Sequence, residues 1–297
     1  MNRTLKATAA LMLMMVFAVG CNNPKDLKNI EVENVQIDSV LGLPKGTYTM
    51  ELPETDLFEW THLSATKNVY LVRPKDSTEP NRIIVVDGEV LDIPSFKKVM
   101  EEWKSSLNKA DVPLMICRLN VDKSLKMNDV NEVMQVLADI KTPRIQYAVV
   151  PKNPEIDIQD YAYVSLHPLW MQGRFRGDSI YREMLDGVCT IPNQINVVSI
   201  GLDAYEINGV LVKGEDSKSM LKGLMQQDLN NVIRFKMDDA MLFDDYIVIV
   251  ISALEALEEL KDEYAMEKYL KHLDEVDLYE EEKEIHDHFP FRFFEEK

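Results

Sequence analysis

The chain has 297 residues, with 33 basic and 51 acidic side chains and a formal net charge of −18 at pH 7. A chain this acidic repels nucleic acid and anionic lipid, and it has no basic stripe that would steer a phosphate backbone. We therefore expect no nucleic-acid partner. The length is enough for about two domains.

The first twenty residues are typical of an export signal. Arg3 and Lys6 give a basic start, and an apolar run follows over residues 7–20. This run has about 14 residues, which is short of the roughly 20 that a helix needs to span a bilayer. We therefore read residues 1–20 as a signal peptide rather than as part of the fold.

The end of this run resembles the lipobox of bacterial lipoprotein signals, with small residues before Cys21 and with Ala18 where leucine is more common. The resemblance implies cleavage before Cys21 and acylation of its sulfur and new amino group. Each buried CH₂ contributes about 0.8 kcal/mol, so two or more acyl chains hold a protein firmly on a membrane. The expectation is a lipid-anchored protein of the bacterial cell envelope with periplasm-facing domains. The alternative is an ordinary secretory signal.

Residues 21–66 are expected to form a polar tether and an N-terminal segment to which the sequence assigns no role. Within it, residues 46–52 alternate between apolar and polar side chains, and Pro44 and Pro53 flank them. This pattern predicts a strand.

A first domain is predicted for residues 67–152, where strand and helix patterns alternate. The pair Asp87-Gly88 is a strong hairpin signal, because both residues tolerate positive φ. Pro94 suits the first turn of one helix, and Asn128 or Asp129 is available to cap a second. The order is strand, strand, helix, strand, helix, strand, with strands at 68–73, 82–86, 114–119 and 145–149.

Residues 153–193 break this pattern and mix aromatic residues with arginines. Such residues are enriched at protein interfaces. One interpretation is a connector packed between two domains. The other is a partner-binding patch, whose candidate residues are Trp170, Arg174, Phe175 and Arg176.

A second domain is predicted for residues 194–297, where the element order restarts. Asn208-Gly209 repeats the hairpin signal, Asp216 or Ser217 opens a helix, and a strand follows over residues 232–237. An apolar helix begins near Tyr246, and its helical pattern continues to about His286. Alternating phenylalanines at positions 289, 291 and 293 predict a last strand, which Pro290 restricts to a sheet edge.

The shared element order predicts an internal duplication. Identity is low when Met115–Ile140 is laid on Val232–Leu257, so this prediction depends on the order and spacing of the elements. Strands 114–119 and 232–237 should then occupy equivalent positions in two sheets. The predicted fold class is α+β: two small ββαβαβ domains with helices packed on one face of each sheet, and a long C-terminal helix.

This pattern resembles the periplasmic domain of the ExbD/TolR family of biopolymer-transport proteins. The stretches that carry the resemblance are VVDGEV at 85–90, PLMICRL at 113–119, EVMQVL at 132–137, RIQYAVV at 144–150, YEINGVLV at 205–212 and VIRFKMDDA at 232–240. The resemblance implies the fold and a habit of dimerising or docking onto envelope partners. Family members carry an aspartate in an N-terminal transmembrane helix. The apolar segment here has no acidic residue, so the proton-coupling role is not carried over.

Few residues are candidates for chemistry, and we expect no catalytic residue, cofactor or metal. Apart from Cys21, the chain has Cys117 and Cys189, which lack the spacing of a metal or redox site and either remain unpaired or form a disulfide. His286 and His288 form a histidine cluster, but on a helix these positions point about 200° apart. Glycine-rich phosphate loops and GxSxG motifs are absent from the sequence.

The acidic stretch 238–245 is the main candidate for a different function. Paired carboxylates can hold Ca²⁺ or work as acid and base, although helix capping explains them more simply. The sequence thus predicts a non-enzymatic lipoprotein that binds an envelope protein or the cell wall, beside a Ton- or Tol-type complex and with self-association as a further expectation. The alternative is an envelope hydrolase or ligand-binding protein that uses residues 153–193 and 238–245.

Overall fold

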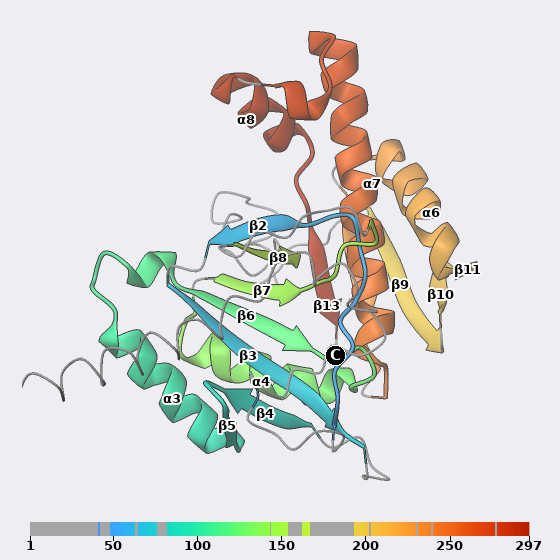
Figure 1. Ribbon diagram of the computed structural model, residues 1–297. Coiled ribbons are helices and arrows are strands. Elements are labelled where there is room, and N and C mark those ends of the chain that lie inside the picture. Colours follow the sequence, from blue (N-terminus) through green and yellow to red (C-terminus); the bar gives the residue numbers. More distant parts are fainter. Residues whose placement is uncertain are drawn as a thin grey trace, which may run out of the picture. The chain divides into compact units, whose positions relative to one another are not determined.

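The computed structural model (Figure 1) is an α+β protein, with two mixed β-sheets and five α-helices among the residues that it describes. These residues all belong to the unit 37–297, while residues 1–36 lie outside the description. The structure describes residues 41, 48–62, 65–75, 82–142, 144–153, 162–166, 193–201, 203–229, 231–238, 240–276 and 278–296.

The first sheet has eight strands, and five of them form its central part in the order β5-β4-β3-β6-β7. Strands β3, β6 and β7 are parallel neighbours, and β4 and β5 continue the sheet in antiparallel pairings. The five are β3 (Thr66–Pro74), β4 (Ile83–Val86), β5 (Glu89–Leu91), β6 (Ile116–Val121) and β7 (Arg144–Ala148).

Three further strands extend the first sheet: β1 (Tyr48–Thr49), β2 (Glu59–His62) and β8 (Ala162–Leu166). The strand predicted at 46–52 is present only as β1, which pairs with the end of β3. Strand β8 pairs with β7 and β2, so part of the predicted connector belongs to the sheet. Both β2 and β8 are short, and neither has the turn signals that mark a strand in sequence.

The second sheet has five strands in the order β11-β10-β9-β12-β13. Strands β9, β12 and β13 are parallel neighbours, and β10 and β11 are antiparallel. The phenylalanine-rich tail does return at a sheet edge, as β13, but the strand begins only at Phe293, so the predicted alternation from Phe289 and the restricting Pro290 lie before it. The five are β9 (Gln194–Gly201), β10 (Ala204–Ile207), β11 (Val210–Lys213), β12 (Val232–Lys236) and β13 (Phe293–Glu296).

The second sheet repeats the order and the strand directions of the central part of the first. Strand β12 occupies the position in the second sheet that β6 occupies in the first, and β13 occupies the position of β7. Helices α3 (Ile93–Ser106) and α6 (Gly214–Gln227) have 14 residues each and follow the hairpin in their half. Helices α4 (Met127–Asp139) and α7 (Phe243–Tyr269) follow the fourth of these strands, β6 and β12.

The two hairpin turns have the same backbone geometry. Asp87 and Gly88 have φ angles of 53° and 81°, and Asn208 and Gly209 have 49° and 82°. Positive φ at both central residues gives a turn whose twist matches that of the flanking strands. Both turns were predicted from sequence for this reason.

The alignment of the two halves differs by one residue from that expected from sequence. In the structure Arg118 pairs with Asn68 across β6 and β3, and Arg234 pairs with Asn196 across β12 and β9. Ile116 therefore corresponds to Val232, whereas the expected alignment placed Met115 there. A shift of one residue moves every side chain of a strand to the other face, so the pairing decides the alignment.

The helix starts also differ from their predictions. Helix α4 has Lys126 as its N-cap, and neither Asn128 nor Asp129 caps it. The carboxylate of Asp129 instead accepts a hydrogen bond from Arg82 at 3.0 Å. Helix α6 begins at Gly214, before the predicted Asp216 or Ser217.

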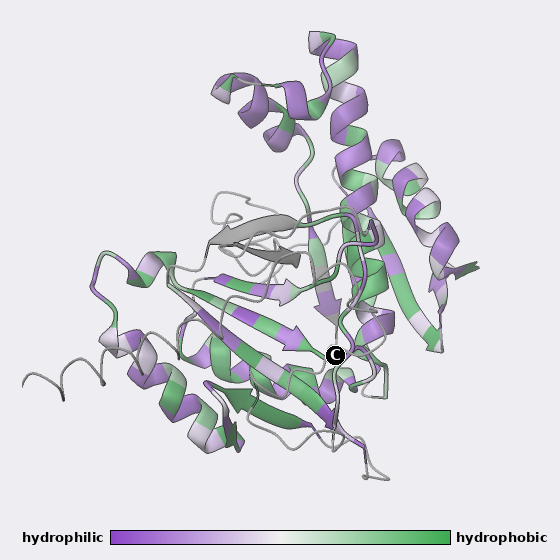
Figure 2. Cartoon of the chain, viewed as in Figure 1, coloured by the Kyte–Doolittle hydropathy of each residue, from purple (hydrophilic) through white to green (hydrophobic). Residues whose placement is uncertain are grey.

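The C-terminal helix does not continue to His286. Helix α7 ends at Tyr269, and Leu270 follows in the left-handed conformation with φ of 56°. The chain then folds back as α8 (Tyr279–His288), which packs on α7 through a stacked pair formed by His288 and Tyr264. Figure 2 shows the green, hydrophobic colour of α7 giving way to purple along its last turns and on α8. The loose apolar stripe of the sequence continues through this region, so it did not reveal where α7 ends.

One hydrophobic core runs through both halves. In each sheet it occupies the face that carries the helices, with Cys117 and Leu119 on β6 and Ile233 and Phe235 on β12. The opposite face of the first sheet has a separate small cluster, which consists of Leu41, Tyr48, Met50, Val72 and Val85. The helix-bearing face of the first sheet therefore belongs to the large core, and its opposite face carries only this small cluster. Among the described residues of the second sheet, no such cluster lies on the opposite face.

Candidate functional site

The residues singled out from sequence for lipid attachment and partner binding lie outside the described residues. These are Cys21 in the export signal and Trp170, Arg174, Phe175 and Arg176 in the connector. Cys189 and His167 also lie outside them. Cys117 is described: it is a free, fully buried thiol in the core, and burial raises the pKa of this thiol. It acts there as a small hydrophobic side chain.

Three histidines near the C-terminus, His272, His286 and His288, have structural contacts. His288 stacks on Tyr264 with 4.4 Å between ring centroids, and His286 lies 3.8 Å from a Glu282 oxygen. His272 contacts Asp262 at 3.2 Å, and this contact raises the pKa of the imidazole. Among the residues that the structure describes, no group of three or more His, Cys, Asp or Glu side chains is placed to hold a metal ion.

The acidic stretch 238–245 begins with a carboxylate that builds a turn. Asp238 Oδ1 accepts the backbone N–H of Ala240 at 2.8 Å. In the first half, Asp122 Oδ1 accepts the backbone N–H of Ser124 at 2.9 Å, two residues on in the same way. Aspartate commonly stabilises a turn by bonding the backbone two residues ahead.

The other two described carboxylates of this stretch lie in the first turn of α7, where the helix dipole favours negative charge. They do not cap the helix, because Leu242 is the N-cap. Asp245 Oδ1 accepts the backbone N–H of Asp203 at 3.1 Å, which ties the helix to the end of the second sheet. Burial raises the pKa of Asp244, and the nearby Lys123 opposes this effect.

The turns before α4 and α7 pair with each other. Met127 N–H donates to the Met241 carbonyl, and Phe243 N–H donates to the Leu125 carbonyl, both at 2.7 Å. Met127 corresponds to Phe243, and Leu125 corresponds to Met241. Reciprocal contacts between corresponding residues are the mark of a two-fold relationship. The two halves therefore meet at this junction much as two copies meet in a symmetric dimer.

Aromatic side chains fill the space beside this junction. Tyr147 on β7 contacts Phe243 with 5.2 Å between ring centroids, and Tyr246 lies 6.3 Å from Tyr147. The Tyr246 hydroxyl donates to Glu295 Oε1 on β13 at 2.7 Å. Burial raises the pKa of both tyrosines, so they remain neutral hydrogen-bonding groups. Sequence patterns did not identify this group, because its members come from elements far apart in the chain.

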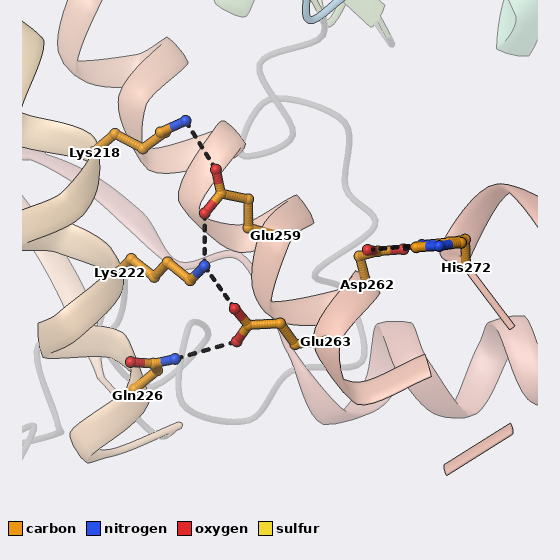
Figure 3. A network of polar contacts seen from close by, with 7 residues as sticks. All are labelled: Lys218, Lys222, Gln226, Glu259, Asp262, Glu263 and His272. Carbon is orange, nitrogen blue, oxygen red and sulfur yellow. Dashed lines mark hydrogen bonds and ion pairs between the residues drawn. The ribbon is translucent and has the colours of Figure 1, made fainter. Parts of the chain in front are cut away.

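Helices α6 and α7 are joined by a ladder of charges at their surface (Figure 3). Lys222 contacts Glu259 at 2.6 Å and Glu263 at 2.8 Å, and Lys218 contacts Glu259 at 2.8 Å. These lysines lower the pKa of Glu259, Lys218 first, and Glu259 raises the pKa of both lysines. The ladder holds two helices together, and its carboxylates already have cationic partners.

The outer faces of the two sheets carry the same Asn–Arg pair. In the first sheet Arg118 is buried and donates to Asn120 Oδ1 at 2.7 Å and to Asn68 Oδ1 at 3.4 Å. In the second sheet Asn196 is exposed and Arg234 is half-buried, with a bond from Arg234 to Gln194 Oε1 at 2.8 Å. In the sequence, this pair is indicated only by the arginine that the stretches ICRLNV (116–121) and VIRFKM (232–237) share at their third position.

A shallow hollow, open to solvent, lies between the end of α6, the middle of α7 and residues 289–292. Polar and apolar atoms share its surface, and Arg292 at its rim donates to the Leu229 carbonyl at 3.3 Å. It has no carboxylate, histidine or cysteine in its lining.

Within the described parts of the chain, none of the helices combines the length and the apolar character needed to cross a bilayer. No protein-family model and no curated protein matches the chain.

Proposed function

We propose that this protein is a lipid-anchored lipoprotein of the bacterial envelope that works by binding a partner, through two ExbD/TolR-like domains at residues 67–152 and 194–297. The observation that carries the proposal is the repeated strand order β5-β4-β3-β6-β7 and β11-β10-β9-β12-β13, with the same directions and the same helix positions. Each half has the order βββαβαβ, which is the ββαβαβ order that the resemblance implies for one domain with one additional short hairpin strand. Its repetition supports an internal duplication.

The non-enzymatic part of the proposal draws on where the polar side chains are used. In the described part of the acidic stretch, Asp238 builds a turn and Asp245 ties α7 to the second sheet. The ladder carboxylates pair with lysines. Groups committed in this way favour a binding role over the alternative of an envelope hydrolase.

The anchor is tested by metabolic labelling with a clickable palmitate analogue. We expect label on the wild-type protein and none on Cys21→Ser, whose signal would also stay attached. Cys117→Ser should keep the label, which controls for acylation at another cysteine. Label that persists in Cys21→Ser would contradict the anchor.

The partner is tested by chemical crosslinking of the acylated protein in its own envelope, followed by purification. We expect a component of a Ton- or Tol-type motor, or of the cell wall, among the crosslinked products. The matched control is an unrelated lipoprotein purified in parallel. Recovery of neither component, under conditions in which the control lipoprotein recovers its own partners, would contradict the proposed function.

A further inference from the structure

A short segment of the chain before β2 is fastened across the ends of two strands of the first sheet. We call this segment, residues 48–55, the strap. It begins as β1, and the Lys123 N–H then donates to the Glu51 carbonyl at 2.8 Å, just after β6. The Thr55 N–H donates to the Val150 carbonyl at 2.9 Å, just after β7. The strap therefore links the residues that follow β6 to those that follow β7.

Asp122, the first residue after β6, is the carboxylate that holds the strap. Its Oδ2 atom accepts the backbone N–H of Glu51 at 3.1 Å, while its Oδ1 atom accepts that of Ser124 at 2.9 Å. Asp122 is 1% exposed. The Glu51 carboxylate also contacts Lys123 Nζ at 3.1 Å, and this hydrogen bond raises the pKa of the lysine. Glu51 is thus held both by its main chain and by its charge.

The strap packs on a hydrophobic cluster that is separate from the large core. Tyr48 and Met50 belong to the small cluster on the outer face of the first sheet. Leu57 and Phe58, just after the strap, pack against the large core instead. A segment whose contacts are local can open while the rest of the fold stays closed. Detachment of the strap therefore leaves the large core in place and stops near Leu57.

The corresponding turn of the second half has an exposed carboxylate. Asp238 corresponds to Asp122, and its Oδ1 atom accepts the Ala240 N–H at 2.8 Å in the same way. Asp238 is exposed, whereas Asp122, which holds the strap, is buried. This turn thus forms around an exposed aspartate as well as around a covered one. The first half can therefore keep its turn after the strap has left.

The strap and the junction between the two halves share one stretch of main chain. Lys123 donates its N–H to the strap, and its carbonyl accepts the N–H of Asp244 in the first turn of α7 at 2.9 Å. Two residues later, the Leu125 carbonyl accepts the N–H of Phe243 at 2.7 Å. The strap and α7 therefore hold the loop of residues 122–126 from two sides.

We propose that the strap is a detachable coupling between the N-terminal segment and the junction of the two halves. While the strap is bound, the loop 122–126 is held from both sides and the junction stays closed. When the strap leaves, α7 alone holds the loop, and the junction opens more often. A pull on the chain before Tyr48 reaches the strap first. The anchor at Cys21 supplies such a pull, and only this last step rests on the proposed function.

The coupling is tested by amide hydrogen exchange, followed by NMR on the full-length chain in detergent. Met50→Ala removes a side chain of the small cluster and changes no residue of the loop or of α7. Exchange of the Phe243 and Asp244 amides should accelerate about tenfold or more, because the strap is detached for a larger fraction of the time. Leu254, in the middle of α7, should exchange at the wild-type rate.

Asp122→Asn loosens the strap at its other contact. Asparagine keeps the Oδ1 acceptor of the turn but presents a donor to the Glu51 N–H, so the bond to the strap is lost while the turn stays. The same two amides should accelerate about tenfold, the effect of losing a hydrogen bond to a charged group. The matched controls are Asp238→Asn, at the corresponding turn, and Leu114→Ala, at an exposed leucine of the first half. Both should leave these amides unchanged.

The response to a pull is tested by single-molecule force spectroscopy on protein made by cell-free translation, in which Cys21 keeps its thiol. Handles are attached at Cys21 and at Asp139→Cys, an exposed site on α4, so that the second sheet lies outside the load path. The background is Cys189→Ser, and Cys117 is buried. We expect a reversible extension of about 30 Å, the length of the strap, at a lower force than the unfolding of the first half.

Unchanged exchange at Phe243 and Asp244 in either Met50→Ala or Asp122→Asn would overturn the inference. Equal acceleration at Leu254, or the same acceleration in a control variant, would do so too, because it would show a general loss of stability. Unfolding of the first half without an earlier extension would show that the strap does not detach under load. None of these measurements uses the acyl group. Failure of the palmitate labelling would remove the source of the pull and leave the coupling in place.

Discussion

Lys126 and Leu242 face each other in an isolated antiparallel bridge, and each is the residue just before the second helix of its half. The backbone bonds on either side of the bridge are reciprocal. Corresponding residues therefore meet at one point, beside which the single hydrophobic core passes from one half to the other. Because of this junction, we expect the two halves to unfold together.

Truncating Phe243 should destabilise the whole unit. Its side chain is fully buried and contacts Tyr147 of the first half. Phe243→Ala should lower the free energy of unfolding by about 3–5 kcal/mol, the usual range for a buried phenylalanine, in a urea titration followed by tryptophan fluorescence and circular dichroism. The two signals should change together, and Phe243→Leu should cost less. Separate transitions for the two halves would show that the junction does not couple them.

Replacing Leu270 by glycine should stabilise the fold. This leucine has a left-handed backbone and an 83% exposed side chain. Glycine removes the strain of about 1 kcal/mol that an L-residue has in this conformation, offset in part by greater freedom of the unfolded chain. We expect a higher melting temperature by calorimetry. The matched Met266→Gly, inside α7, should lower it, and a lower value for Leu270→Gly would contradict the assigned turn.

The contact of His272 with Asp262 should make the turn after α7 sensitive to pH. Hydrogen bonding to Asp262 comes first among the causes that raise the pKa of His272 above 6.5, and Glu275 and Asp274 add to it. The folded-state pKa is raised, so the stabilisation is fully present below pH 6.5 and is lost as the pH rises through the folded value. NMR titration should show the raised pKa in wild type and a lower one, closer to 6.5, in Asp262→Asn. An unchanged titration in that variant would assign the shift to other groups.

Removing Lys222 should have a small effect that depends on salt. This lysine bridges Glu259 and Glu263 at the surface, and exposed pairs contribute about 0–1 kcal/mol. Lys222→Met should lower stability by about 0.5–1 kcal/mol at low ionic strength, with most of the difference gone in 1 M salt. Lys98→Met, which removes a longer exposed pair within α3, should have less effect. A loss that 1 M salt leaves unchanged would point to packing rather than charge.

The features of this fold that depend on neighbouring residues could be predicted from the sequence. Asp87-Gly88 and Asn208-Gly209 set the hairpins through backbone geometry that neighbouring residues determine. The period of α3 came from burial on one face, whereas all six residues of β6 are buried. The equivalence of β6 and β12 followed from the order of elements alone. Strands β2 and β8 were missed because a pairing between distant segments leaves no local period.

The candidate site was also hard to predict, because its residues come from segments that are far apart in the chain. Asp238 was noted as part of an acidic stretch, but its correspondence to Asp122 appears only when register fixes the alignment. The aromatic group around Tyr246 joins residues from β7, α7 and β13. Helix α7 was extended too far because the apolar stripe continued beyond Leu270, where the chain turns back on itself.

The excursion from α7 through α8 separates β12 from its parallel neighbour β13 by many more residues than separate β6 from β7. Closing a longer loop costs more chain entropy before any pairing repays it, and non-local pairing is slow. The first sheet should therefore gain its amide protection earlier during refolding than the second. For a newly made chain, the edge of β12 stays unpaired until Phe293 and its neighbours arrive, and that interval is when this protein is most open to mispairing.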